Sequence, residues 1–182
     1  DLAPGRCSPG DVVLMNGHVG DHGSASMSAR TGFDLSAVVV RAPCSLTPVM
    51  LALCKLVPEL HVLRDPTRGG LASSLNEIAQ SSDTGITLFE SHLPIHEGVK
   101  GACELMGYDP LYIANEGKIL VILPEQHAPK ALSIMQSHPE GTESRIIGKV
   151  TSSHPGLLQL ETTIGTKRIV DMISGEQLPR IC

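Results

Sequence analysis

Residues 61–79, which read HVLRDPTRGGLASSLNEIA, contain the transition that decides the fold. The short and mostly apolar run 61–63 is typical of a β-strand. A polar turn with two adjacent glycines follows it, and Leu71, Leu75 and Ile78 then recur at the spacing of one helical face. A strand, a glycine turn and a helix in close succession indicate a domain in which helices pack on a sheet.

The same kinds of segment extend along the rest of the chain. Short runs rich in apolar and β-branched residues predict strands at 11–14, 37–40, 61–63, 86–89, 118–123, 145–150, 157–160 and 168–173. Apolar residues at helical spacing predict helices within 46–57, 71–79, 95–106 and 128–135. Helices and strands alternate in the middle, and strands follow one another at the end. This order predicts an α+β fold, a layered α/β domain with helices packed on a mixed sheet.

The length of the chain favours a single main domain. It has 182 residues, of which 41% are hydrophobic, so it can bury one sizeable core. Residues 1–10 are rich in proline and glycine and are expected to act as a linker. We expect the domain to span 11–175 and a mobile tail to span 176–182.

The composition excludes several classes of protein. The net charge is −5, and the chain has two Phe, two Tyr and no Trp, so we expect no nucleic-acid partner. No apolar run reaches the roughly 18 residues of a membrane span, and no signal peptide opens the chain, which predicts a cytoplasmic protein without a membrane partner. The five cysteines include no C-x-x-C pair, which argues against a disulfide framework and a zinc knuckle.

The turn at 65–70 is a candidate phosphate site. The backbone at Gly69 and Gly70 can approach an anion closely, and the amino end of the following helix points N–H groups at it. Arg68 can add a forked donor, and Asp65 can hold Mg²⁺. The alternative is that Thr67 only caps the helix, the glycines pack against the sheet and Arg68 is solvated. The residues alone do not separate these two interpretations.

A second candidate is the stretch Asn115-Glu116-Gly117-Lys118, which leads into an apolar strand. A carboxylate at the mouth of a strand can act as a general base if burial tunes its pKa. A glutamate in a loop is more often simply solvated.

The histidines carry no metal-binding motif. His18 and His22 stand four residues apart, but the glycines around them make a helix improbable. Pro94 breaks the helical register between His92 and His96 in the same way. We therefore assign none of the eight histidines to a metal.

The chain ends in a cysteine. Cys182 has the freedom of a chain end, and Arg180 favours its thiolate. Cys54 and Cys103 lie on or beside apolar helical stripes and are expected to be buried. The alternative is that Cys182 is a chance cysteine on a frayed terminus.

Taken together and in this order, several motifs resemble the HypE family of carbamoyl dehydratases. This family belongs to the superfamily of aminoimidazole ribonucleotide synthetase and selenophosphate synthetase. The resemblance covers nearly all of the chain. The glycine turn alone is moderately specific, whereas ANEGK followed by PRIC at the end is highly specific. The motifs are GDHG at 20–23, RDPTRGGL at 64–71, ACELMG at 102–107, DPL at 109–111, ANEGK at 114–118 and PRIC at 179–182.

The resemblance implies a protein of two domains that uses ATP and Mg²⁺. An amino-terminal domain would precede the linker and provide most of the ligands for both, so we expect this chain alone to bind ATP weakly and to be inactive. Asp65 would be the metal ligand on this chain. One departure is Ala42, which stands where relatives have an aspartate. The implied nucleotide-binding residues are Asp65, Thr67, Arg68, Gly69 and Gly70.

The resemblance also implies a reaction. HypF transfers a carbamoyl group to Cys182, and phosphorylation of the carbonyl oxygen by ATP then permits loss of water, which leaves a thiocyanate. Glu116 is the candidate base for the nitrogen proton, with Asn115 as its hydrogen-bonding neighbour. The substrate tail comprises Pro179, Arg180 and Ile181.

The implied partners follow from this reaction. The HypC–HypD complex would accept the cyanide, which becomes a ligand of the active-site iron of nickel–iron hydrogenase, and the full-length protein would be a homodimer. Two other classes stay open. Another ATP-using enzyme of the superfamily would have its reactive cysteine near its amino terminus, and a docking module would only present the tail to partner proteins.

Overall fold

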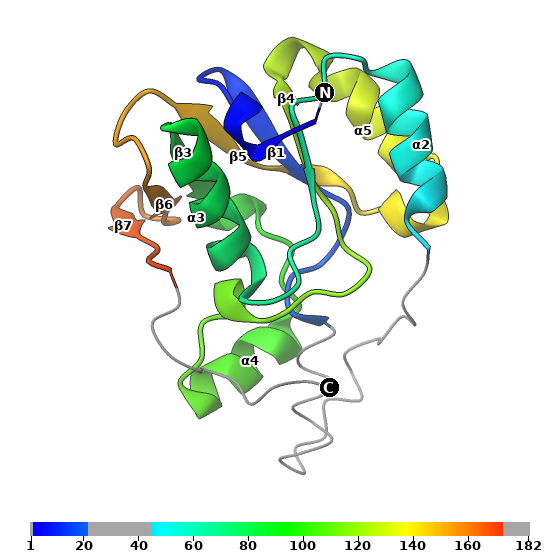
Figure 1. Ribbon diagram of the computed structural model, residues 1–182. Coiled ribbons are helices and arrows are strands. Elements are labelled where there is room, and N and C mark those ends of the chain that lie inside the picture. The colour runs from blue at the N-terminus through cyan, green and yellow to red at the C-terminus, as the bar shows by residue number, and fades with distance from the viewer. Residues whose placement is uncertain (1, 22–44, 173–182) are drawn as a thin grey trace.

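The computed structural model describes residues 2–21 and 45–172. Within these residues, seven strands form one sheet in the order β2-β4-β1-β5-β3-β6-β7 (Figure 1). Only β3 and β6 pair in parallel, and all other neighbours are antiparallel. The strands are β1 (Asp11–Met15), β2 (Val62–Arg64), β3 (Gly85–Phe89), β4 (Leu120–Pro124), β5 (Arg145–Thr151), β6 (Leu158–Glu161) and β7 (Lys167–Ile169).

Each of the four helical stretches predicted from the sequence forms a helix. These are α2 (Thr47–Leu56), α3 (Gly70–Ser82), α4 (Glu97–Met106) and α5 (Ala128–Gln136). Short 3-10 helices lie between the larger elements: η1 (Pro4–Arg6), η2 (Glu90–His92), η3 (Pro110–Tyr112), η4 (Glu125–His127) and η5 (Pro139–Gly141). The expected strand at 37–40 lies outside the described residues.

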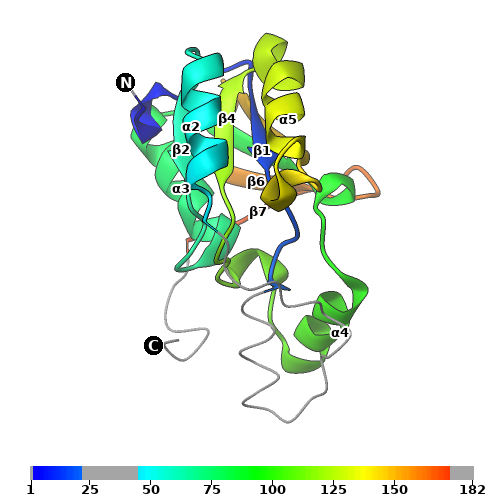
Figure 2. The ribbon, with the colours of Figure 1, turned by 90° about the vertical axis from the view of Figure 1, so that its right-hand side faces the viewer.

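The sheet is covered on both faces. Strand β1 is buried along its whole length, and its side chains alternate between two cores. Val13 and Met15 join the core beneath α3, whereas Val12 and Leu14 join the core beneath α2 and α5. Figure 2 shows α2 and α5 on the near face of the sheet and α3 behind it. The predicted α+β fold with helices on a mixed sheet is therefore confirmed.

Helix α4 lies beyond one end of the sheet rather than on a face (Figure 1). Its buried residues Val99 and Cys103 form a small separate core with Ile113. This core supports the loops that approach that end of the sheet.

The first residues pack against the domain. The N–H of Ala3 donates a hydrogen bond to the carbonyl of His61, and η1 contacts α3. Cys7 is only 3% exposed. That this segment links the domain to another one stays a prediction.

The prediction that Cys54 and Cys103 are buried is confirmed for only one of them. Cys103 is buried, but Cys54 is exposed, so the prediction for Cys54 was wrong. The inward face of α2 is formed by Val49 and Leu53, and Cys54 lies about 100° around the helix from Leu53. Burial raises the pKa of the Cys7 and Cys103 thiols to about 11.

The helices carry no membrane-spanning segment within residues 2–21 and 45–172, since none there is both long and apolar enough to cross a bilayer.

Candidate functional site

The strand register brings three loops together at one end of the sheet. Met15 at the end of β1 and Arg64 at the end of β2 both pair with Leu120 at the start of β4. The segments that leave β1 and β2 therefore lie beside the segment that enters β4. They meet near α4, at the lower end of the sheet in Figure 1.

Asn115 ties the three loops together from the inside. It is 1% exposed, and its Oδ1 accepts a hydrogen bond of 2.7 Å from the N–H of Gly20. Its Nδ2 donates to the carbonyls of Ile113 (2.9 Å) and Pro66 (3.4 Å), and its own N–H donates to Pro66 at 3.1 Å. We call Asn115 and these three partners the Asn115 clamp. A buried and fully bonded amide of this kind fixes loop positions.

A second buried asparagine holds the other side of the same loop. The Oδ1 of Asn16 accepts a hydrogen bond from the N–H of Ile119 at 2.7 Å. Its Nδ2 donates to the carbonyls of Glu140 (2.9 Å) and Gly117 (3.3 Å). Glu116 therefore stands on a backbone that is anchored on both sides. No motif in the sequence singles out Asn16, because its partners are distant along the chain.

Glu116 itself is exposed. The sequence predicts a general base on the condition that burial tunes its pKa, and the described residues do not supply that burial. Lys118, two residues on, is more enclosed, and its Nζ lies 4.0 Å from Oδ2 of Asp21.

The glycine turn leads into α3 as predicted, but Thr67 does not cap the helix. The N-cap is Gly69, in the left-handed conformation with φ of 76°, and none of the residues that the structure describes caps this end with a side chain. The first turn of α3 contains no acidic residue. Asp65 and Arg68 are both exposed beside it. The backbone N–H groups at the start of α3 carry the positive end of the helix dipole, and no carboxylate in the first turn offsets it. Such a helix start is suited to an anion.

Gly70 is packed closely against its neighbours. Its φ is 62°, and a Cβ there would lie 2.5 Å from the carbonyl oxygens of both Leu111 and Ile113. The start of α3 is thus pressed against η3 and the segment that follows it. Gly70 therefore packs against η3 and not against the sheet.

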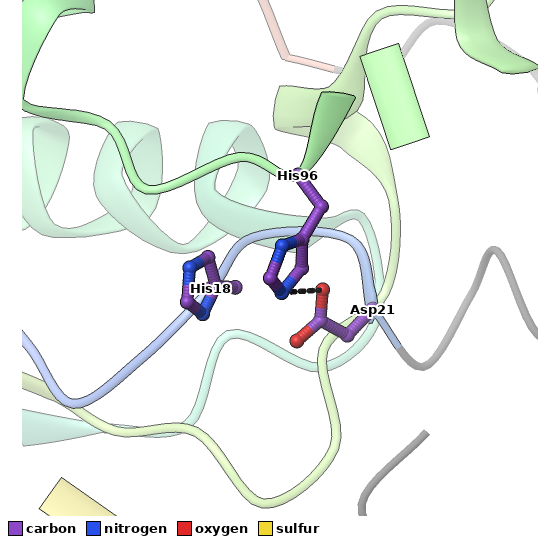
Figure 3. Close-up of side chains that lie close together, drawn as sticks. All are labelled: His18, Asp21 and His96. Atoms are coloured by element: carbon purple, nitrogen blue, oxygen red, sulfur yellow. Dashed lines mark ion pairs between the residues drawn. The ribbon is translucent and has the colours of Figure 1, made fainter. Parts of the chain in front are cut away.

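A cluster that the sequence does not predict lies next to the Asn115 clamp. His18, Asp21 and His96 place three possible metal-ligand atoms within 4.8 Å of one another. Figure 3 shows the two imidazoles facing each other, with the Asp21 carboxylate beside His96. The rings are stacked at 3.8 Å, and Oδ1 of Asp21 lies 3.7 Å from Nε2 of His96. Burial, together with the charge of His96, lowers the pKa of His18.

The spacing of residues along the sequence does not reveal this cluster. The sequence draws attention to His18 with His22 and to His92 with His96, because these pairs have short spacings. The fold instead joins His18 to His96 from two distant loops. Short spacings in the sequence therefore do not reveal the pair that the fold brings together.

Several predicted residues lie outside the described part of the chain. They are Ala42, Pro179, Arg180, Ile181 and Cys182.

Comparison with known proteins identifies relatives of the whole chain. The family described as AIR synthase related protein, C-terminal domain, matches residues 8–159. The carbamoyl dehydratase HypE of Azotobacter vinelandii is 45% identical over 181 residues, which are 100% of this chain and 53% of that protein. The chain thus spans about half the length of the curated relatives it matches.

Solved structures give the same result. A crystal structure of the hydrogenase maturation protein HypE in complex with ATP aligns with a TM-score of 0.93 and 42% identity, over 100% of this chain and 55% of that one. A structure of a HypE–HypF complex aligns with a TM-score of 0.88 and 43% identity, over 95% of this chain and 56% of that one.

Proposed function

The chain belongs to the family of AIR synthase related proteins, C-terminal domain, and from this we propose that it is the carboxy-terminal part of a HypE-type carbamoyl dehydratase. The observation that carries the proposal is the 45% identity to a HypE protein along the entire chain. The three loops held together by the Asn115 clamp support it, because they bring the RDPTRGGL and ANEGK motifs to one place.

The reaction that we propose is the ATP-dependent dehydration of a thiocarbamate. Cys182 carries the carbamoyl group as S–C(=O)–NH₂. Phosphorylation of the carbonyl oxygen converts it into a leaving group, a base removes the protons of the nitrogen, and phosphate departs. The products are S–C≡N on Cys182, ADP and phosphate.

Glu116 is the base in this proposal. Its backbone is anchored by Asn115 and Asn16, so a carboxylate there can be placed reproducibly against a docked tail. The side chain is exposed in this chain, and docking of the tail would remove it from water.

The turn 65–70 would contact the nucleotide. The uncapped start of α3 suits a phosphate, and Arg68 is exposed beside it. Asp65 offers a single exposed carboxylate, which suits Mg²⁺ because this ion usually binds one or two carboxylates together with phosphates and waters. An amino-terminal domain would supply the remaining contacts.

The partners belong to the proposal as well. HypF would deliver the carbamoyl group, in line with the HypE–HypF complex among the similar structures. The HypC–HypD complex would accept the cyanide for nickel–iron hydrogenase. The full-length protein would act as a cytoplasmic homodimer.

Intact-mass analysis of the full-length protein tests the proposal. Incubation with HypF, carbamoyl phosphate and ATP should first add one carbamoyl group and then remove one water from the adduct. A Cys182→Ser variant should neither gain the carbamoyl group nor lose water. Absence of any adduct on the wild-type protein would favour a docking module instead.

A further inference from the structure

We propose that His18, Asp21 and His96 form a binding site for a late first-row divalent metal ion such as Zn²⁺, separate from the Mg²⁺ that accompanies ATP. The three residues offer two imidazole nitrogens and one carboxylate oxygen within 4.8 Å of one another. Two imidazoles disfavour Mg²⁺ and Ca²⁺, which prefer oxygen ligands, and favour zinc, nickel or cobalt. Three protein ligands also leave a fourth position open to water or substrate.

The backbone that carries these ligands is already fixed. The N–H of Val19 donates a hydrogen bond of 2.8 Å to the carbonyl of Pro94, which joins the loop of His18 to the loop of His96. Val19 is fully buried. On the other side, the N–H of Gly20 is held by Asn115 at 2.7 Å. The ligands therefore need only side-chain adjustment to meet an ion.

The two oxygens of Asp21 face different groups. Oδ1 lies 3.7 Å from Nε2 of His96, whereas Oδ2 lies 4.0 Å from Nζ of Lys118. One oxygen can thus join the ion while the other remains beside the ammonium group. Partners of this kind outside the ligand set orient ligating carboxylates in metal sites.

The required adjustment is small. Ligand atoms at about 2.0–2.2 Å from zinc are roughly 3.3–3.6 Å apart in a tetrahedral site. The Asp21–His96 separation of 3.7 Å is already close to that value. The stacked rings of His18 and His96, inclined by 14°, must fan apart so that both nitrogens point at one ion.

Metal titration of the full 182-residue chain tests the proposal. Zn²⁺ binding is measured by calorimetry, and Co²⁺ serves as a spectroscopic probe whose thiolate charge-transfer band would reveal binding by cysteine instead. We expect one ion per chain, and no thiolate band. His18→Gln and His96→Gln should each weaken binding by about 100-fold or more, since loss of an outer partner alone costs 10–100-fold.

His92→Gln is the matched control, because His92 is exposed on the same loop as His96. It should bind Zn²⁺ like the wild type. Asp21→Asn keeps the shape of the third ligand, removes its charge and should also weaken binding. Circular dichroism shows which variants are folded, and only those are compared. The proposal is overturned if the wild type binds no ion, or if the folded His18, Asp21 and His96 variants bind as His92→Gln does.

Discussion

The Asn115 clamp and the histidine cluster share one loop, yet they differ in nearly every physical respect. The clamp is buried, and its amide donates and accepts at hydrogen-bond distances. In the cluster, Asp21 lies 3.7 Å from Nε2 of His96 and 4.0 Å from Nζ of Lys118, and the His96 side chain is 40% exposed. A buried, satisfied group stabilises a loop, whereas a partly exposed imidazole such as that of His96 can still take a ligand. The comparison predicts that stability depends on the clamp and ligand binding on the cluster.

The largest loss of stability is expected at the packing contact beside the clamp. Gly70→Ala would place a Cβ 2.5 Å from two carbonyl oxygens at a φ of 62°, so unfolding free energy should fall by about 4 kcal/mol or more. Gly107→Ala is the control, since its φ is 70° but no atom of residues 2–21 or 45–172 lies within 4 Å of the added Cβ. That variant should lose about 1–2 kcal/mol. Equal losses in urea denaturation would contradict the packing role of Gly70.

The clamp itself should show the next largest effect. Asn115→Ala leaves the N–H of Gly20 and the carbonyl of Pro66 without the side-chain partner, which should cost about 2–3 kcal/mol. Glu116→Ala, the neighbouring exposed residue, should change stability by no more than about 0.5 kcal/mol. The unfolding free energy of both variants is measured in urea. An Asn115→Ala variant as stable as the wild type would show that the clamp does not stabilise the domain.

The smallest effect is expected in the histidine cluster and depends on pH. The folded state lowers the pKa of His18, so the unfolded chain takes up this proton first as the pH falls below about 6.5. The free energy of unfolding therefore keeps its full value at neutral pH, as far as His18 is concerned, and falls as the pH drops below about 6.5. In His18→Gln, the slope of unfolding free energy between about pH 7 and pH 5 should be shallower. An unchanged slope would mean that His18 is not held neutral by its surroundings.

Much of the architecture follows from local patterns. The helix at 71–79 and the glycine turn before it were predicted because periodicity and turn chemistry are local properties. Most element ends moved by one or two residues, but α3 extends to Ser82, and the strand expected at 168–173 ends at Ile169. The face that a residue presents was less predictable, as Cys54 shows: its neighbour Leu53 is buried, but Cys54 points outward.

The site was only partly predictable. The motifs mark Asn115, Glu116 and the turn 65–70, but they do not reveal that Asn115 is a clamp, because its partners come from other loops. The pairing of His18 with His96 depends on the hydrogen bond from Val19 to Pro94 and on the packing of α4. Contacts of this kind are created by the tertiary fold and leave no spacing in the sequence.

The proposed role of Glu116 as the base, on the loop held by Asn115 and Asn16, is tested most directly with Glu116→Gln in the full-length protein. Intact mass is followed over time after carbamoylation by HypF and addition of ATP. Glu125→Gln is the control, an exposed glutamate just beyond the other end of β4. We predict that Glu116→Gln still gains the carbamoyl group but loses water about 100-fold more slowly, while Glu125→Gln behaves like the wild type. Thiocyanate formation at the wild-type rate in Glu116→Gln would show that Glu116 is not the base.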